Sequence, residues 1–410
     1  MSHKIKFKNQ TPISKKKKSL LIFVLLGSLT LTPTLYFSLR FSPIITSELP
    51  RIYILSSEEI TSDTYTDCEI VIQDEVILAK IRIRGEATEH HPKDGYRFEL
   101  SKQRSLLGMR EDDDWQLFSM WCDLPRMRIK LSIDLWRSLE ETNPTAILPD
   151  SRYVNLYLNR AYQGFYLLLE KNDRKLFQLE DAQNNIDSSL IFQVKGSTSL
   201  REYEEDCWEQ DWPNEDEGIF IMEDIVTDLI YFIKNANNSE FFNLDNGIYT
   251  IFDKNNLIDF YLYNFFIYHN DFWDNNYFLI RNTAPHKFFL IPWDFDGSFG
   301  QLRGKLFDAD LSHESFIKEN NELFNRLLSN TSFLQECKDR WFELREKLWT
   351  KNFILDMLSD MYEEIKEIIE YDVNMSYKPS MEQELSEYID DLFEWIPDRL
   401  DFCDSYFEKY

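Results

Sequence analysis

The hydrophobic pattern of the chain changes its period partway along, and this change limits the possible folds most. In the first part, RIYIL (51–55) and VILAKIRIR (76–84) alternate or run apolar with β-branched residues, which is typical of strands. In the last part, apolar residues recur at helical spacing, as in EIKEIIE and FEWIPDRLDFCDSYF. We therefore predict an α+β fold with two lobes, a β-rich N-lobe over 50–172 and a mainly helical C-lobe over 173–410.

Individual elements follow from the same patterns. We predict strands at 51–55, 68–74, 76–84, 96–100, 153–159 and 162–170, a helix over 123–139 capped by Asp123, a helix-like segment at 176–182, an acidic solvated loop at 199–218, and helices over 223–270 and 311–410. One further hairpin pairs 277–282 with 287–293 and lies within the helical part.

The first 46 residues differ from the rest, because they hold eight cations and no acid. The uncharged run from Leu20 to Leu39 is long enough to span a bilayer, and Lys15–Lys18 come directly before it. We predict a basic cytoplasmic tail over 1–18 and a transmembrane anchor over 19–39. The chain would then be a single-pass membrane protein with an extracytoplasmic body, and a cleaved signal peptide is the alternative.

The body after residue 46 is strongly acidic. Of 45 cations in the whole chain, 37 lie in the body against 72 acids, which gives a net charge of −35. Such a charge argues against nonspecific binding of nucleic acid, whose affinity comes from cations on phosphates. The five cysteines include no C-x-x-C pair, so neither a disulfide framework nor a cysteine zinc site is predicted.

The densest group of polar residues lies at 269–300, around the second hairpin. Asp271 and Asn276 precede one strand, and Asp294 and Asp296 follow the return strand. In an antiparallel pair the start of one strand lies beside the end of the other, so all four residues are expected at one mouth. Carboxylate and amide oxygens suit Mg²⁺, although Asx turns capping a polar hairpin end would give the same pattern.

Several segments resemble one known family. They are IRIRGEATEHHPKDGYRFEL (81–100), LPRMRIKLSIDLW (124–136), YVNLYLNRAYQGFYLLLEKND (153–173), HNDFWDNNY and IPWDFDGSFG within 269–300, and WIPDRLDFCDSYF at the end of the chain. Together they resemble the spore coat protein H (CotH) kinase family, an atypical protein-kinase-like group, over roughly 50–410. The resemblance implies a two-lobed, protein-kinase-like fold.

The resemblance also implies roles for the residues around the second hairpin. Asp271 would be the catalytic aspartate that accepts a hydroxyl proton. Asn276, Asp294 and Asp296 would bind Mg²⁺ (or Mn²⁺), which neutralises developing phosphate charge. The implied activity is Mg-dependent transfer of the ATP γ-phosphoryl group to a Ser or Thr of a protein.

A kinase of this kind needs cations on the nucleotide phosphates and a hinge segment beside the base. Arg97 follows the loop after residue 84, Lys93 lies in that loop, and Glu170 ends the strand that leads into the hinge at 171–172. These three residues are the predicted nucleotide contacts, although surface cations and a strand-end Glu would look the same. The loop departs from the usual family pattern by placing Glu86 where phosphate would approach.

Two other classes of protein stay open from the sequence. The D-x-D at 294–296 also occurs in glycosyltransferases, where it binds a nucleotide-sugar through a divalent metal. Those enzymes use a parallel sheet, which needs repeated βαβ units, and the sequence pattern of this chain does not indicate such units. A non-catalytic surface adhesin or assembly protein that keeps the fold is the other alternative.

Overall fold

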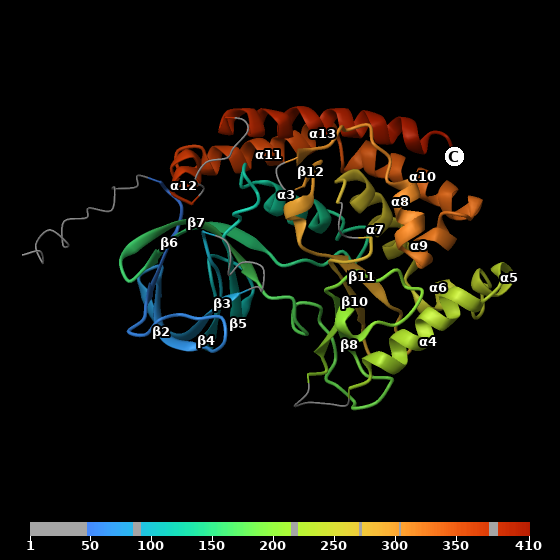
Figure 1. Ribbon diagram of the computed structural model, residues 1–410, viewed down its shortest axis with the longest axis horizontal. Coiled ribbons are helices and arrows are strands. Elements are labelled where there is room, and N and C mark those ends of the chain that lie inside the picture. The colour runs from blue at the N-terminus through green and yellow to red at the C-terminus, as the bar shows by residue number, and fades with distance from the viewer. Residues whose placement is uncertain (1–46, 85–91, 215–219, 270–272, 303–304, 377–383) are drawn as a thin grey trace, which may run out of the picture. The chain divides into compact units, whose positions relative to one another are not determined.

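A computed structural model describes most of the body of the chain (Figure 1). The described residues are 47–84, 92–214, 220–269, 273–302, 305–376 and 384–410. The region Ser47–Tyr410 forms one compact unit, and the predicted division at 172/173 within it stays a prediction.

The predicted membrane segment, 19–39, lies outside the described residues, as does the basic tail. Within the ranges that are described, every helix is too short or too polar to cross a bilayer. The prediction of a single-pass membrane protein is therefore not supported, and we withdraw it.

Seven strands of the first part close into a barrel in the order β1-β2-β3-β4-β5-β7-β6. They are β1 Arg51–Leu55, β2 Thr66–Ile72, β3 Glu75–Arg84, β4 Gly95–Ser105, β5 Glu111–Phe118, β6 Ser151–Leu158 and β7 Ala161–Glu170. Alternate residues point inward, so that Ile70, Phe98 and Trp115 are fully buried in the barrel core. The barrel confirms that the first part of the chain is β-rich.

Strand β5 was not predicted, because its sequence EDDDWQLF begins with four acids. The structure shows how these acids are accommodated. Asp112 is fully buried in an ion pair with Arg110 (2.6 Å) and contacts Lys175 (3.1 Å). Partners outside the strand thus allow an acidic segment to join the sheet.

A second sheet has the strand order β11-β10-β8-β9, and all of its pairs are antiparallel. Its strands are β8 Leu190–Val194, β9 Trp208–Trp212, β10 Tyr277–Arg281 and β11 Phe289–Pro292. The predicted hairpin is confirmed, with Tyr277 opposite Pro292. The hairpin does not stand alone, however, and the predicted loop at 199–218 is wrong where β9 lies, because Trp208 is buried there.

Most of the rest of the unit is helical, apart from a short antiparallel pair of β12 Gln301–Leu302 and β13 Lys305–Leu306, and this confirms the predicted character of the last part. The helices are α3 Arg128–Arg137, α4 Met222–Asn235, α5 Asn238–Phe241, α6 Ile248–Ile251, α7 Lys254–Phe266, α8 Glu314–Asn320, α9 Glu322–Leu327, α10 Thr331–Lys347, α11 Lys351–Ile365, α12 Ile369–Ser376 and α13 Leu385–Phe407. Helix α7 is buried along most of its length, while α13 runs along the top of the view in Figure 1.

Two predicted helical features are wrong. The segment at 176–182 contains turns rather than a helix, and its Phe177 packs against Phe289 of β11. Asp123 is not the N-cap residue of α3, which begins five residues later at Arg128, although its carboxylate accepts a hydrogen bond from the backbone N–H of Ile129 in the first turn (3.3 Å). The guanidinium of Arg126 donates hydrogen bonds to the carbonyls of Met120, Trp121 and Asp123, and these bonds hold the segment before α3 in turns.

The carboxylate of Asp372 on α12 joins the helical part to the barrel. It is fully buried and accepts hydrogen bonds from Lys93 Nζ (2.7 Å), Arg126 Nε (3.0 Å) and the backbone N–H of Phe165 (3.0 Å). It reaches β7 beside Gly164, whose φ of +105° lies in the region that favours glycine. A Cβ on Gly164 would lie 2.2 Å from Asp372 Oδ1, so this close approach requires glycine.

We expect Gly164→Ala to lower the free energy of unfolding by ~2–5 kcal/mol, measured by urea denaturation. The methyl group adds steric overlap with Asp372 to the backbone strain of a non-glycine residue at positive φ. Gly108→Ala is the matched control, because Gly108 has a φ of +80° and no neighbour within 4 Å of an added Cβ. The control should lose only ~1–2 kcal/mol, and equal losses in the two variants would contradict this interpretation.

Candidate active site

The second hairpin brings two of the predicted site residues together at one mouth. Asn276 comes directly before β10 and Asp294 follows β11, and the N–H of Trp293 donates to the carbonyl of Asn276 (2.9 Å). Asn276 and Asp294 have φ values of 58° and 61°. Asn and Asp accept this left-handed conformation more readily than other non-glycine residues. The backbone therefore suits the residue types whose oxygens were predicted to bind a metal.

A histidine ties the end of the α7 segment to this mouth. The ring Nε2 of His269 lies 2.6 Å from the backbone carbonyl of Asp294. A carbonyl only accepts hydrogen bonds, so Nε2 carries the proton. Asp271, the predicted catalytic residue, is two positions further along the chain and lies outside the described residues.

The two acids of the D-x-D, Asp294 and Asp296, both act electrostatically on the thiol of Cys122. Asp294 is exposed and Asp296 is half-buried. Desolvation, followed by the charges of Asp296 and Asp294, raises the pKa of the Cys122 thiol to about 12. Within the described part of the chain no three His, Cys, Asp or Glu side chains gather into a metal cluster. The predicted ligand set includes an amide and so is not such a cluster.

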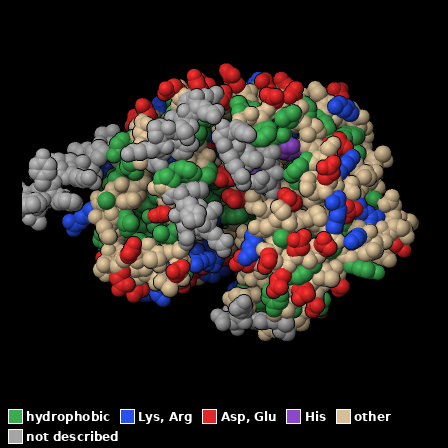
Figure 2. Space-filling view, in the orientation of Figure 1, with side chains coloured by type: hydrophobic (Ala, Val, Ile, Leu, Met, Phe, Trp, Pro, Cys, Tyr) green, Lys and Arg blue, Asp and Glu red, His purple; other side chains and the backbone are tan. Residues whose placement is uncertain are grey.

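A cleft of about 630 Å³ lies between the barrel and the second sheet, and it contains a group of cations. Figure 2 shows Lys and Arg side chains on both sides of the hollow between the two parts. The cations that line the cleft are Arg82, Arg84, Arg97, Lys171 and Lys195. Three acids also line it, namely Asp63, Glu209 and Asp211. In a body with a net charge of −35, such a local excess of cations favours an anionic ligand.

Arg97, one of the predicted nucleotide contacts, lies on the wall of this cleft. On the barrel sheet, Arg82 of β3 is opposite Arg97 of β4, which is opposite Gln116 of β5, so the three residues share one face. Arg97 forms a 3.5 Å ion pair with Asp114. The Nε atoms of Arg82 and Arg97 are nevertheless buried without a hydrogen-bond partner.

Sequence reasoning missed Arg82 and Arg84 as site residues, although IRIR contained the necessary signal. Residues two apart on a strand share a face, so Arg82 and Arg84 both line the same cleft as Arg97. Desolvation lowers the pKa of Arg84 to about 10, while the charge of Asp294 opposes that shift and Arg97 adds to it. Arg84 thus connects the cationic wall electrostatically with the hairpin mouth.

Lys93 lies in the interior rather than on the cleft wall. Its ammonium donates to the carbonyl of Phe165 (2.6 Å) and to Asp372 (2.7 Å), and the residue is 4% exposed. Burial lowers the pKa of Lys93 to about 8, and the charge of Asp372 opposes the shift. These contacts favour an internal ion pair over the predicted contact with nucleotide.

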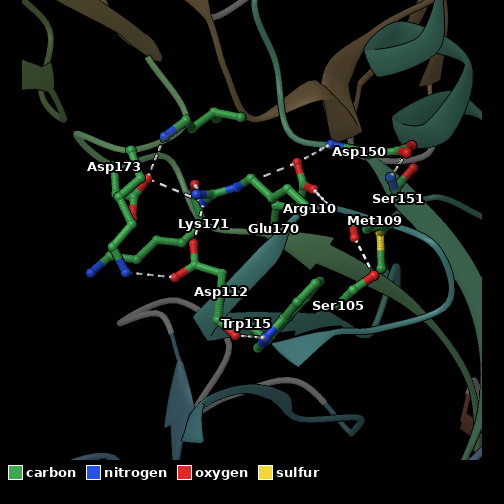
Figure 3. A network of polar contacts seen from close by, with 12 residues as sticks. Ser105, Met109, Arg110, Asp112, Trp115, Asp150, Ser151, Glu170, Lys171 and Asp173 are labelled. Atoms are coloured by element: carbon green, nitrogen blue, oxygen red, sulfur yellow. Dashed lines mark hydrogen bonds and ion pairs between the residues drawn. The ribbon is translucent and has the colours of Figure 1, made fainter. Parts of the chain in front are cut away.

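The carboxylate of Glu170 also has its hydrogen-bond partners within the protein, as Figure 3 shows. Its carboxylate accepts from the backbone N–H groups of Arg110 (2.8 Å) and Asp150 (2.9 Å). The Arg110 guanidinium continues the network to the carbonyl of Lys171 (3.0 Å) and to Asp173 (3.1 Å). The Glu170 side chain thus fixes the segment that leaves the barrel, and the predicted contact with adenine stays untested.

Aromatic residues close the inner side of the cleft. Trp293 packs edge-on against Phe118 of the barrel (5.8 Å between ring centroids) and against Phe278 of β10 (5.9 Å). Trp293 and Phe278 both line the cleft. These contacts give Trp293 a packing role and also present an apolar surface to the cleft.

A buried histidine lies behind the mouth. His313 is 5% exposed, and its ring centroid lies 3.5 Å from that of Tyr268. Burial, and then the positive charge of Arg399 and the neighbouring His269, lowers the pKa of His313 to about 3. Arg399 also donates to the carbonyls of Phe265 and Phe266 at the end of α7. This cluster supports the segment that carries His269.

Comparison with known proteins finds a matching family model and a similar spore coat protein. A family model described as CotH kinase protein matches residues 81–403. Inner spore coat protein H of Bacillus subtilis (strain 168) is 24% identical over 333 residues, which cover 78% of this chain and 84% of that protein.

Two similar solved structures are kinases. The proinflammatory kinase CtkA of Helicobacter pylori is 11% identical, with a TM-score of 0.27, over 88% of this chain and 98% of its own. The Golgi casein kinase with Mn/ADP bound is 9% identical, with a TM-score of 0.26, over 88% and 74%.

The pKa of His313 predicts how stability depends on pH. The folded protein holds this ring neutral down to a pKa of about 3, whereas the ordinary value is 6.5, so the unfolded chain binds more protons between these values. Stability should therefore fall as the pH drops from about 6.5 toward 4, measured by urea denaturation. His313→Gln should flatten this dependence, and His286→Gln, at an exposed histidine of the hairpin turn, should not. Identical pH dependence in both variants would contradict the assignment.

Proposed function

The chain belongs to the CotH kinase protein family, and from this premise we propose that it transfers the γ-phosphoryl group of ATP to a Ser or Thr hydroxyl of a protein, with Mg²⁺ or Mn²⁺. One observation carries the proposal. The cationic wall of the cleft reaches the hairpin mouth, where Arg84 experiences the charge of Asp294. A phosphate chain needs cations on one side and metal-binding oxygens on the other, and this arrangement supplies both.

The arginines of the barrel are suited to bind the phosphates of ATP. Arg84 stays charged at neutral pH, since its pKa of about 10 is well above 7. The buried Nε–H groups of Arg82 and Arg97 lack partners, and phosphate oxygens would accept from them. Arginine pairs with phosphate through a planar fork, which fixes orientation as well as charge.

The metal would be held at the hairpin mouth by Asp294, Asn276 and Asp296. The donor set fits, because all three side chains offer the oxygen ligands that Mg²⁺ and Mn²⁺ accept. Asp294 is exposed just after β11 and directly follows Trp293, which lines the cleft. A bound cation would neutralise the charge that develops on the transferring phosphoryl group.

Asp271 is the proposed base. The acceptor hydroxyl oxygen forms a bond to the γ-phosphorus, the bond from that phosphorus to the bridging oxygen of ADP breaks, and the hydroxyl proton passes to the carboxylate of Asp271. His269 supports this assignment, because its hydrogen bond to the Asp294 carbonyl links the segment before Asp271 to the metal-binding residues. The antiparallel second sheet does not favour the glycosyltransferase alternative.

Binding of Mg·ATP should raise the unfolding free energy of the wild type by about 2.7 kcal/mol at a ligand concentration 100 times the Kd. Arg97→Ala should weaken that affinity roughly 10- to 100-fold, because a charged hydrogen-bond donor to phosphate is lost. Asp294→Asn should remove the dependence of binding on Mg²⁺. Calorimetric titration measures both effects.

Lys234→Ala is the matched control for these variants, because Lys234 is an exposed cation on α4 outside the cleft. It should bind Mg·ATP as the wild type does. Unchanged affinity in Arg97→Ala would place the nucleotide elsewhere, and unchanged Mg²⁺ dependence in Asp294→Asn would move the metal site.

Asp271→Asn should bind Mg·ATP normally but lose phosphoryl transfer by ~10²–10⁴-fold, which is the usual contribution of a general base. Transfer of radiolabelled phosphate to the enzyme itself or to a protein acceptor measures the loss. If Asp271 only caps a turn, asparagine would replace it almost without effect. A folded variant with wild-type transfer would therefore remove Asp271 from the mechanism.

A further inference from the structure

Asn172, in the segment that leaves the barrel after β7, has a side chain without partners. The residue lines the cleft and is 7% exposed. Both polar atoms of its carboxamide, Nδ2 and Oδ1, are buried and lack a hydrogen-bond partner among the described residues. A buried amide normally pairs both its donor and its acceptor, because leaving either unpaired costs stability. The unpaired donor and acceptor of Asn172 therefore point to a bound ligand that supplies their missing partners.

The position of Asn172 within the cleft indicates which part of a ligand it meets. The barrel sheet carries a row of side chains that runs from Arg82 on β3 through Arg97 on β4 to Gln116 on β5. Gln116 in turn is opposite Leu169 of β7, which lies three residues before Asn172 in the chain. In the order of the strands, the arginines of β3 and β4 therefore lie further from β7 than Gln116 of β5 does. The phosphates would bind at the arginines and at the hairpin mouth, which leaves the other end of the ligand near Asn172.

The surroundings of that end suit a planar, uncharged group. Gln193 of β8 lines the same cleft as Gln116, and it is opposite Phe278 of β10. Phe278 and Trp293 supply aromatic surface within this cleft. Amide and aromatic side chains together are the usual means by which proteins hold a nucleobase.

We propose that the carboxamide of Asn172 binds the 6-amino group and an adjacent ring nitrogen of adenine, and so selects the base of the nucleotide. Oδ1 accepts from the amino group while Nδ2 donates to the ring nitrogen, an arrangement that uses both unpaired atoms. The two rotatable bonds of the side chain allow the amide to turn toward the base. This inference rests on the proposed function, because it requires a nucleotide in the cleft.

The test combines one change in the protein with one change in the ligand. Asn172→Leu keeps the shape of the side chain and removes both polar atoms. Its affinity for Mg·ATP should fall roughly tenfold or more, whereas its affinity for purine riboside triphosphate, which keeps the ring nitrogens but lacks the 6-amino group, should fall by less. The wild type should prefer ATP over this analogue, and the variant should not. Calorimetric titration of the full chain gives all four affinities.

A second measurement separates ligand binding from a structural role. Without nucleotide, Asn172→Leu should unfold at the same or a higher temperature than the wild type, because a buried unpaired amide has been replaced by an apolar group. Asn235→Leu, at an exposed asparagine that ends α4, is the control and should change neither affinity.

The outcomes distinguish this inference from the proposed function. If the wild type and Asn172→Leu bind both triphosphates with the same preference, Asn172 does not select the base, although the nucleotide site stands. Lower thermal stability of the variant with equal losses for both ligands would show a structural role and would also overturn the inference. If the wild type binds no nucleotide at all, the proposed function itself fails and this inference falls with it.

Discussion

The fold depends on one buried carboxylate that pairs with two cations. Asp372 binds Lys93 of the barrel and Arg126 of the segment before α3, and all three side chains are almost wholly buried. Breaking such a pair by removing one partner costs ~3–5 kcal/mol, since the remaining charge stays in the interior. Arg126 in turn holds the carbonyls around Cys122, and Cys122 lies beside Asp296. A contact between the barrel and α12 therefore supports the wall of the candidate site.

The elements that could be predicted from the sequence were those whose pattern is local. The second hairpin was predicted correctly because each strand is apolar and the pairing of neighbours in the chain is antiparallel. Strands β5 and β9 could not be predicted in this way, because their acids suggest solvated loops. Asp112 shows the physical reason, since its buried charge is balanced by Lys175, which is 63 residues away in the chain.

The same distinction holds for the candidate site. Asn276 and Asp294 could be placed together because they flank one hairpin. Lys93 was expected to face a nucleotide, yet its partner is 279 residues further along the chain, and no local pattern indicates that pairing. The unpaired amide of Asn172 was equally inaccessible, since the lack of partners is a property of the folded interior.

The dependence on Asp372 also bears on how the protein is made. The chain is synthesised from its N-terminus, and the barrel strands emerge long before α12. Until Asp372 arrives, Lys93 and Arg126 would have to be buried without a counter-charge, and the space beside Gly164 would stay unfilled. The barrel consequently cannot reach its final packing during translation of its own residues. Completion of the N-terminal part waits for almost the whole chain to leave the ribosome.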